Sequence, residues 1–410
     1  MSLFSVNPAA AVSAGPELAV PLEQETSRPK VAAPRLINSS TRIPALDGLR
    51  GWAILLVLMF HSVFTRMNVH TPVYKSILRL GALTWSGVDL FFVLSGFLIG
   101  GILLDARESP NYFKTFYFRR AYRILPLYLS LLCLCWLAYH AGIYGLAPAS
   151  WAGVFRGPVP WWTFFTFTQN IWMAVAGHFT GGGLGVTWSL AVEEQFYLTL
   201  PLVVWSVSRK RLWHVALAIV IGTALFRVLL TYFSPMRGPD FYGVLRVDGL
   251  GLGVLSALLV REPRSWNYLV SHRRLLYFCS SALLVAVLLI DLVSYPGSTV
   301  SLYGLQFSVL DLFYTSALLT AVTAEDRFVR ATLCNRPLMK LGIISYGTYL
   351  LHALCLDIVR EIPPSAHLPM TALITNGAML VGVGMAILLA ALSWNYFEKP
   401  LVRRGRVYTY

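Results

Sequence analysis

Long apolar stretches, each of about 20 residues, follow one another along most of this 410-residue chain. A helix needs about 20 apolar residues to cross a bilayer, and a backbone in lipid must satisfy its own hydrogen bonds. Only 13% of the residues are charged, which is about half the share of a soluble domain. We therefore expect an all-α, polytopic integral membrane protein with about ten transmembrane helices. The stretches are 48–66, 82–104, 124–142, 186–207, 212–232, 242–260, 275–293, 302–322, 341–360 and 371–395.

The lysines and arginines are strongly biased to alternate connections between these stretches. If the amino terminus is cytoplasmic, segments on that side carry 25 of the 33 Lys and Arg residues, and segments on the opposite side carry four. Positive residues accumulate in cytoplasmic loops, so the bias predicts ten spans with both termini in the cytoplasm. It also accounts for most of the net charge of +14 without nucleic acid as a partner.

Composition divides the chain into three regions. Residues 1–41 are rich in Pro, Ala and Ser and lack a long apolar run, which predicts a disordered cytoplasmic tail. Residues 42–400 form the expected transmembrane domain, and residues 401–410 a short basic cytoplasmic tail. The five cysteines are scattered and contain no CxxC pair, so we expect neither a metal site nor a disulfide framework.

The longest connection on the outer side, 143–185, is rich in Trp, Phe and Gly. Its aromatic residues fit a belt at the membrane interface, where amphipathic rings accumulate. A stacking surface for a sugar is the alternative. Composition favours the belt, and the alternative stays open.

Arg50 and His61 lie eleven residues apart in the first apolar stretch, "LDGLRGWAILLVLMFHS". On an α-helix this spacing returns to within about 20° of the same face and separates the residues by about 16 Å along the axis. Ionisable groups at membrane depth cost about 2.5–3.5 kcal/mol each on insertion scales and mark functional sites. A snorkelling arginine with a packing histidine is the structural alternative. We interpret Arg50 as the anion-facing inner end of a path and His61 as its catalytic or proton-handling centre.

Further ionisable residues recur at a similar depth. Asp89 in the second stretch is expected level with His61, where a carboxylate would orient the imidazole ring; capping of the hairpin is the alternative. His352, in "ISYGTYLLHALCLD", competes with His61 as the central base. Adjacent carboxylates point to different faces of a helix, so of Glu193 and Glu194 we favour Glu194 for the cavity, with a structural ion pair to Arg227 or Arg246 as the alternative. The other candidates are Asp47, Glu193, Arg246 and Asp248.

The stretch "YFKTFYFRRAYRILPLYL" presents Arg119, Arg120 and Arg123 at the inner surface, just before the third apolar stretch. Arg119 and Arg123 are four residues apart and share a helix face. Guanidinium groups bind phosphates through two parallel hydrogen bonds. A phosphate-binding role and plain positive-inside anchoring are equally compatible with this pattern.

An ordered set of motifs resembles the membrane acyltransferase 3 family. The motifs are "IPALDGLRGWAILLVLMFHS", "GVDLFFVLSGFLIGGIL", "FYFRRAYRILPLYL", "TWSLAVEEQFYL", "SYGTYLLH" and "YFEKP", and together they span about residues 43 to 400. The resemblance implies a ten-helix membrane domain that moves acyl groups, commonly acetyl, from cytoplasmic acyl-CoA onto hydroxyls of surface carbohydrates or other acceptors.

The resemblance also implies roles for single residues. Arg50 and His61 match the family's essential Arg and His, the group Arg119–Arg123 its basic motif, and Glu194 its acidic one. It implies a multi-pass protein of the plasma membrane with acyl-CoA as co-substrate and no bound cofactor. The expected partners are the bilayer, a carbohydrate or other hydroxylated acceptor, and other proteins of envelope polysaccharides. Some relatives carry an added hydrolase-like domain outside the membrane, which we do not expect in these 410 residues.

Two functional hypotheses follow. In the first, His61, aided by Asp89 or Glu194, acts as general base on an acceptor hydroxyl, or forms a transient acyl-histidine. In the second, the same buried groups couple protons to transport or flipping of a polar or lipid-linked substrate. The second is weaker, because the sequence has no evident internal repeat or pair of interrupted helices.

Overall fold

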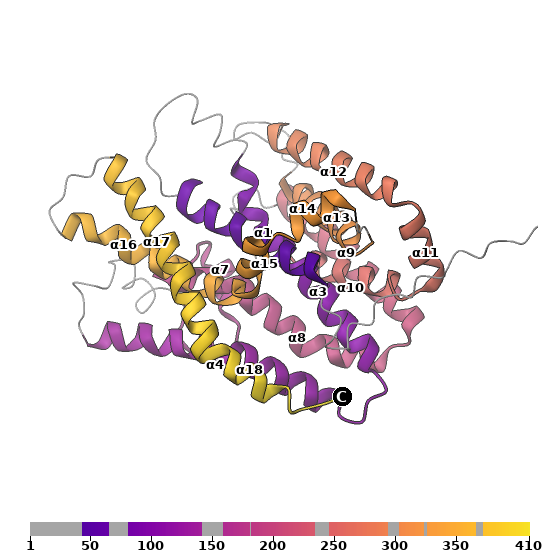
Figure 1. Cartoon of the computed structure of the whole chain (residues 1–410), viewed down its shortest axis with the longest axis horizontal. Helices are drawn as coiled ribbons and strands as arrows, with labels where there is room; N and C mark the ends of the chain where they lie inside the picture. The colour runs from indigo at the N-terminus through magenta and orange to yellow at the C-terminus, as the bar shows by residue number, and fades with distance from the viewer. Residues whose placement is uncertain are drawn as a thin grey trace, which may run out of the picture. The chain divides into compact units, whose positions relative to one another are not determined.

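The computed structural model describes residues 43–64, 81–141, 159–180, 182–233, 246–293, 303–323, 326–365 and 372–410. The expected disordered tail at 1–41 lies outside these residues. Within them the chain is helical and contains no strand, as the apolar runs predict (Figure 1). The first half comprises α1 (Pro44–Met59), η1 (Phe60–Phe64), η2 (Ala82–Ser86), α3 (Gly87–Ala106), α4 (Tyr112–His140), α6 (Trp162–Phe165), α7 (Gln169–Ala176), η3 (Gly182–Thr187), α8 (Trp188–Ser206) and α9 (Arg209–Phe233).

The second half continues with helices only. It comprises α10 (Val247–Leu259), α11 (Pro263–Ser271), α12 (Arg273–Val293), α13 (Tyr303–Thr323), α14 (Arg327–Leu333), α15 (Arg336–Ile343), α16 (Ser345–Ser365), α17 (Ala372–Ser393), η5 (Trp394–Glu398) and α18 (Lys399–Gly405). The described part of each of the ten expected apolar stretches therefore coincides with a helix or a pair of helices.

Seven helices in the described part of the chain are long and apolar enough to cross a membrane. The consecutive helices α15 and α16 pass the same test together, but they meet at a bend of 77°, so they form a broken span or a re-entrant segment. The remaining two expected stretches are occupied by α8, which carries two glutamates, and by α10, which has 13 residues. The structure thus supports a multi-pass helical membrane protein with seven or eight candidate spans.

Helix α3 lies at the centre of the helical assembly, with 78% of its membrane-length window buried. Glycines let neighbouring backbones approach it closely. A Cβ atom on Gly96 would lie 2.1 Å from the Leu250 carbonyl oxygen, and one on Gly253 would lie 2.3 Å from the Val93 carbonyl oxygen. Small residues at helix contacts are the usual means of close packing in membranes. Helix α10 is therefore fixed against α3 by backbone contact.

We expect Gly253→Ala to destabilise the protein by about 1–3 kcal/mol, because the added methyl group must displace the backbone of α3. Gly384→Ala in α17 is the matched control, since a Cβ atom there meets nothing within 4 Å. Thermal unfolding of the two purified variants in detergent, followed by tryptophan fluorescence, measures the difference. Equal midpoints for the two variants would contradict the packing argument.

The carboxy-terminal residues pack on α4 (Figure 1). Helix α18 crosses the predicted domain boundary at residue 400 without a break. The Thr115 hydroxyl donates to the Thr409 carbonyl at 2.8 Å, and Arg119 Nε donates to the Tyr408 carbonyl at 2.8 Å. Burial raises the pKa of the Tyr410 phenol, and the nearby guanidinium groups of Arg120 and Arg119 oppose this rise. The last residues are thus held by specific contacts with the helix that carries the predicted basic motif.

Candidate active site

Three arginines converge on one cavity of about 840 Å³, a volume that includes its open mouth. Arg50 comes from α1, and Arg120 and Arg123 come from successive turns of α4. We call this space the arginine cavity. Its other polar lining residues are Ser95, Ser189, Glu193, Tyr197, Ser345, Tyr346 and Tyr349. Because three guanidinium groups face a single carboxylate, the cavity has an excess of positive charge and suits an anionic ligand.

The basic motif of α4 divides between two tasks. Arg120 and Arg123 are three residues apart, so both reach the arginine cavity. Arg119 instead binds the Tyr408 carbonyl, and its guanidinium carbon lies 5.1 Å from the centre of the Tyr410 ring. The sequence pattern predicted that Arg119 and Arg123 act together from one helix face. In the structure, Arg120 and Arg123 line the arginine cavity together.

The wall of the arginine cavity contains Glu193. Its Oε1 accepts a hydrogen bond of 2.6 Å from the Ser95 hydroxyl, which in turn accepts one of 3.2 Å from the Tyr197 hydroxyl. The sequence favoured Glu194 for this position. Glu194 is not among the lining residues, and its buried Oε1 has no hydrogen-bond partner among the residues described. Only the rotation of α8 distinguishes the two carboxylates.

The two histidines that competed as central base are neighbours. The ring centroids of His61 and His352 lie 4.9 Å apart. His61 belongs to η1, a π-helical turn that follows α1, and such turns are frequent at functional sites. Its Nδ1 lies 3.0 Å from the Val57 carbonyl, and Nδ1 of His352 lies 2.6 Å from the Tyr349 carbonyl. Donation from Nδ1 to a carbonyl leaves Nε2 as the basic nitrogen of each ring.

Tyr349 connects the arginine cavity with the histidine pair. It lines the cavity, and its ring centroid lies 5.6 Å from that of His352. Its hydroxyl is 2.6 Å from the Ser189 hydroxyl and donates to the Val186 carbonyl at 2.9 Å. Tyr349 was not predicted from the sequence, although the motif "SYGTYLLH" places it three residues before His352. A tyrosine one helical turn from a candidate histidine was the available signal.

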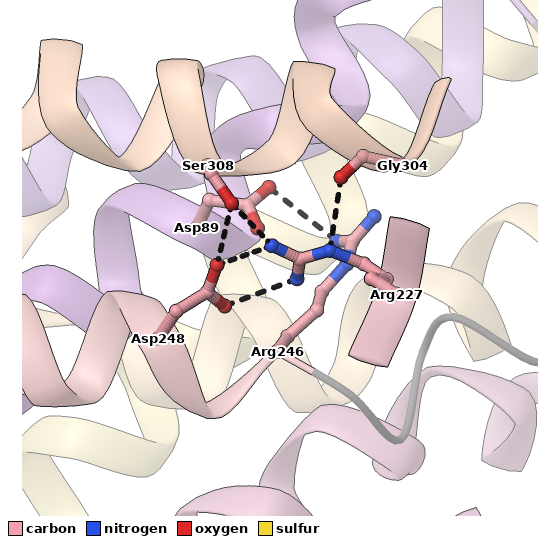
Figure 2. A network of polar contacts seen from close by, with 6 residues as sticks. All are labelled: Asp89, Arg227, Arg246, Asp248, Gly304 and Ser308. Carbon is pink, nitrogen blue, oxygen red and sulfur yellow. Dashed lines mark hydrogen bonds and ion pairs between the residues drawn. The ribbon is translucent and has the colours of Figure 1, made fainter. Parts of the chain in front are cut away.

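The candidate aspartates have arginine partners. Asp89 Oδ2 accepts from Arg246 at 3.4 Å, and Asp248 binds Arg227 through both carboxylate oxygens (Figure 2). Asp47 lies 3.7 Å from Arg50. Arg227 and Arg246 were considered as ion-pair partners of Glu194. In the structure they pair with Asp248 and Asp89 instead. These pairs give Asp89, Arg246 and Asp248 partners of opposite charge, and the role of Asp89 at His61 stays a prediction.

Comparison with known protein families gives one match that covers most of the chain. The model of the acyltransferase domain family aligns with residues 43–395. The chain belongs to the acyltransferase domain family. Arg50, His61, Arg120, Glu193 and His352 all lie within the matched residues. No solved structure matches the chain.

Curated relatives align with most of the chain. The Bacillus subtilis protein named "Putative peptidoglycan O-acetyltransferase YrhL" is 31% identical over 384 residues, covering 88% of this chain and 55% of the relative. "Putative O-acetyltransferase SACOL0978" of Staphylococcus aureus is 26% identical, covering 88% and 58%. "Peptidoglycan O-acetyltransferase OatA" of Listeria monocytogenes is 25% identical, covering 88% and 56%. The chain spans about half the length of the curated relatives it matches.

Proposed function

We propose that this chain is a membrane-bound O-acyltransferase. It moves an acyl group, for which acetyl is the expected identity, from acyl-CoA to a hydroxyl of a carbohydrate or related acceptor at the cell surface. The observation that carries the proposal is the arginine cavity, whose Tyr349 wall adjoins the His61–His352 pair. Relatives named as O-acetyltransferases, two of them with peptidoglycan in their names, support the acyl group and the class of acceptor.

The positive charge of the arginine cavity supports acyl-CoA as the donor. Acyl-CoA carries its phosphates at one end and its thioester at the end of a long flexible arm. Arg50, Arg120 and Arg123 offer forked donors that suit phosphate oxygens. The arm would extend past Tyr349, so that the thioester comes to the histidine pair. The donor is a co-substrate in this scheme, and the chain itself needs no bound cofactor.

The chemistry assigned to His61 is general base catalysis. Its Nε2 takes the proton of the acceptor hydroxyl while that oxygen attacks the thioester carbonyl. The carbon–sulfur bond then breaks, and the departing CoA thiolate takes the proton from the imidazolium. In the covalent alternative, Nε2 attacks the thioester first and the CoA thiolate leaves. The acceptor hydroxyl then attacks the acyl-histidine, the bond between the acyl carbon and Nε2 breaks, and the hydroxyl proton passes to the thiolate. Both routes give the same ester and free CoA.

Replacing Arg120 or Arg123 with glutamine should raise the KM for acyl-CoA about tenfold or more, because each loses a charge-assisted hydrogen bond to the donor. Arg119→Gln is the matched control, since Arg119 binds the Tyr408 carbonyl outside the cavity. Initial rates with radiolabelled acetyl-CoA measure the effect. If Arg119→Gln alone raised the KM, the assignment of the donor site to this cavity would be wrong.

We further propose ten spans, with both termini in the cytoplasm of a plasma-membrane protein. The bias of Lys and Arg toward alternate connections supports this arrangement. Single cysteines introduced at Glu108 and His178, in a variant without its own five cysteines, test it with membrane-impermeant reagents. Labelling in intact cells is expected at position 178 and not at position 108. The reverse pattern would invert the orientation.

The first experiment uses the purified protein in nanodiscs with radiolabelled acetyl-CoA and a panel of oligosaccharide acceptors. Label transfer together with release of CoA supports the acyltransferase. If no acceptor promotes CoA release, and the chain drives substrate uptake that depends on a proton gradient, the transporter hypothesis replaces it.

A further inference from the structure

Five charged side chains gather inside the helical assembly, away from the arginine cavity. They come from α3, α9, α13 and the start of α10, and their relative exposures are 9% or less. We call them the α10 charge cluster; its members are Asp89, Arg227, Arg246, Asp248 and Asp311. Figure 2 shows four of them with Ser308 and Gly304. None lines the arginine cavity.

One carboxylate of the cluster is fully paired. Asp248 receives two hydrogen bonds from the Arg227 guanidinium and a third, of 3.2 Å, from the Ser308 hydroxyl. Arg227 also donates to the Gly304 carbonyl at 3.1 Å. These contacts satisfy both partners, so Asp248 and Arg227 form a neutral unit.

A second carboxylate has a looser partner. Arg246 donates to Asp89 Oδ2 at 3.4 Å, and its guanidinium carbon lies 4.3 Å from the centre of the Phe307 ring and 4.8 Å from that of Trp85. Aromatic faces attract a cation but accept no strong hydrogen bond. Asp89 Oδ1 is buried without a hydrogen-bond partner among the described residues. The pair is neutral but leaves one carboxylate oxygen unsatisfied.

Asp311 is the third carboxylate, and the cluster holds no third cation for it. Its side chain is 1% exposed, and its Oδ1 has no hydrogen-bond partner in the described part of the chain. The charged groups that act on it are Asp248 of α10, Asp89 of α3, Arg227 of α9, and Arg246. Both guanidinium groups already donate hydrogen bonds to other carboxylates, Arg227 to Asp248 and Arg246 to Asp89.

Among the described residues, the remaining surroundings of Asp311 supply no further cation. Tyr314 lies near it on α13, and its hydroxyl is 2.6 Å from the Ser86 hydroxyl. On the side of α10, a Cβ atom on Gly249 would lie 2.9 Å from Asp311 Oδ1, so backbone packs against the carboxyl. On α12, Asp291 accepts a hydrogen bond from Gln306. A buried carboxylate without a cation or donors is far less stable than its neutral acid.

We propose that the α10 charge cluster is a proton-binding site, in which Asp311 holds one proton and makes three carboxylates and two guanidinium groups neutral as a set. A monovalent cation would balance the same charge. The proton is favoured because Asp248 and Asp89 already pair with the two guanidinium groups, and a proton needs only the one remaining carboxyl group of Asp311. This inference does not depend on the proposed acyl transfer.

Infrared spectroscopy of the full chain in nanodiscs at neutral pH tests the site directly. A protonated carboxylic acid has a carbonyl stretching band that is absent from a carboxylate and shifts in D2O. The difference spectrum between wild type and Asp311→Asn is expected to contain this band. Asp291→Asn, outside the cluster, is the matched control and should leave it in place. A difference spectrum that shows loss of a carboxylate band instead would overturn the proposal.

The dependence of stability on pH gives an independent readout. If folding adds a proton to Asp311, wild-type stability falls as pH rises from about 5 to 8, because the unfolded carboxyl is already ionised there. Asparagine matches the neutral acid in size and carries no such dependence. Asp311→Asn should therefore have a flatter pH profile and, at pH 8, a Tm at least equal to that of wild type.

Three results would contradict the proton site. One is a strong drop in Tm for Asp311→Asn at every pH, or its failure to fold, since asparagine reproduces the neutral side chain. Another is an unchanged pH profile. The third is a wild-type Tm that rises with sodium or potassium concentration and loses this response in Asp311→Asn, which would identify a cation site instead.

Discussion

His61→Ala should abolish acyl transfer, lowering kcat/KM by a factor of about 10² to 10⁴, while the protein stays folded. The ring is half-buried in a π-helical turn, and its Nδ1 bond to the Val57 carbonyl is local to that helix. Removing the ring takes away the proposed base and its contact with the neighbouring His352 ring, and it leaves the helical backbone of η1 in place. Label transfer from radiolabelled acetyl-CoA, with monodisperse elution from a sizing column as the test of folding, measures the effect.

A second histidine provides the matched control for this prediction. His214 in α9 bonds the carbonyl four residues earlier, that of Lys210, at 2.9 Å, in the same way as His61. It is exposed and lies apart from the arginine cavity, so His214→Ala should transfer normally. Normal transfer by His61→Ala would refute the assignment. A greater loss in His352→Ala than in His61→Ala would make His352 the base.

Arg227→Met should be the most destabilising single change in the described core, with a loss of about 3–5 kcal/mol. Arg227 and Asp248 both have 0% relative exposure, so removal of the guanidinium leaves a buried carboxylate without its cation. Thermal unfolding in detergent and the yield of folded protein measure the loss. The double variant Arg227→Met with Asp248→Leu should recover most of it, because no charge remains unpaired.

The ion pair between Arg261 and Asp105 is the control for this effect. It also has two short hydrogen bonds, of 2.7 and 2.6 Å, but the Asp105 side chain is 15% exposed. Water can reach that carboxylate when its partner is removed, so Arg261→Met should be milder. If Arg227→Met and Arg261→Met were equally destabilising, burial would not explain the large effect expected for Arg227→Met. If the double variant at positions 227 and 248 were no more stable than Arg227→Met alone, the unpaired carboxylate would not explain the loss of stability.

The helices were predictable because each span must carry its own apolar run. The candidate site was predictable in part, since Arg50, His61 and His352 are ionisable residues within apolar stretches and therefore conspicuous in the sequence. Arg120 and Arg123 were found as a basic motif next to such a stretch. The adjacency of His61 and His352 was not predictable, because they lie almost 300 positions apart and only tertiary packing brings them together.

Three further features depend on rotation or pairing that a single sequence does not contain. Glu193 and Glu194 are chemically equal neighbours, and only the orientation of α8 selects Glu193 for the arginine cavity. Asp89 pairs with Arg246 because α3 and α10 are in contact through glycines. The calculation of 20° between Arg50 and His61 assumes a regular α-helix. The π-helical turn at Phe60–Phe64 changes the rotation that this assumption gives.

The contrast between α3 and α12 has a consequence for how freely each helix accepts mutations. The membrane-length window of α3 is 78% buried, whereas that of α12 is 6% buried. In a saturation-mutagenesis screen, exchanges among Leu, Ile, Val and Phe should be almost silent along α12, where the requirement is only to be apolar. Along α3 the same exchanges should be poorly tolerated, because each side chain there fits a particular neighbour. Two helices of nearly equal apolarity would thus differ strongly in the number of substitutions that they tolerate.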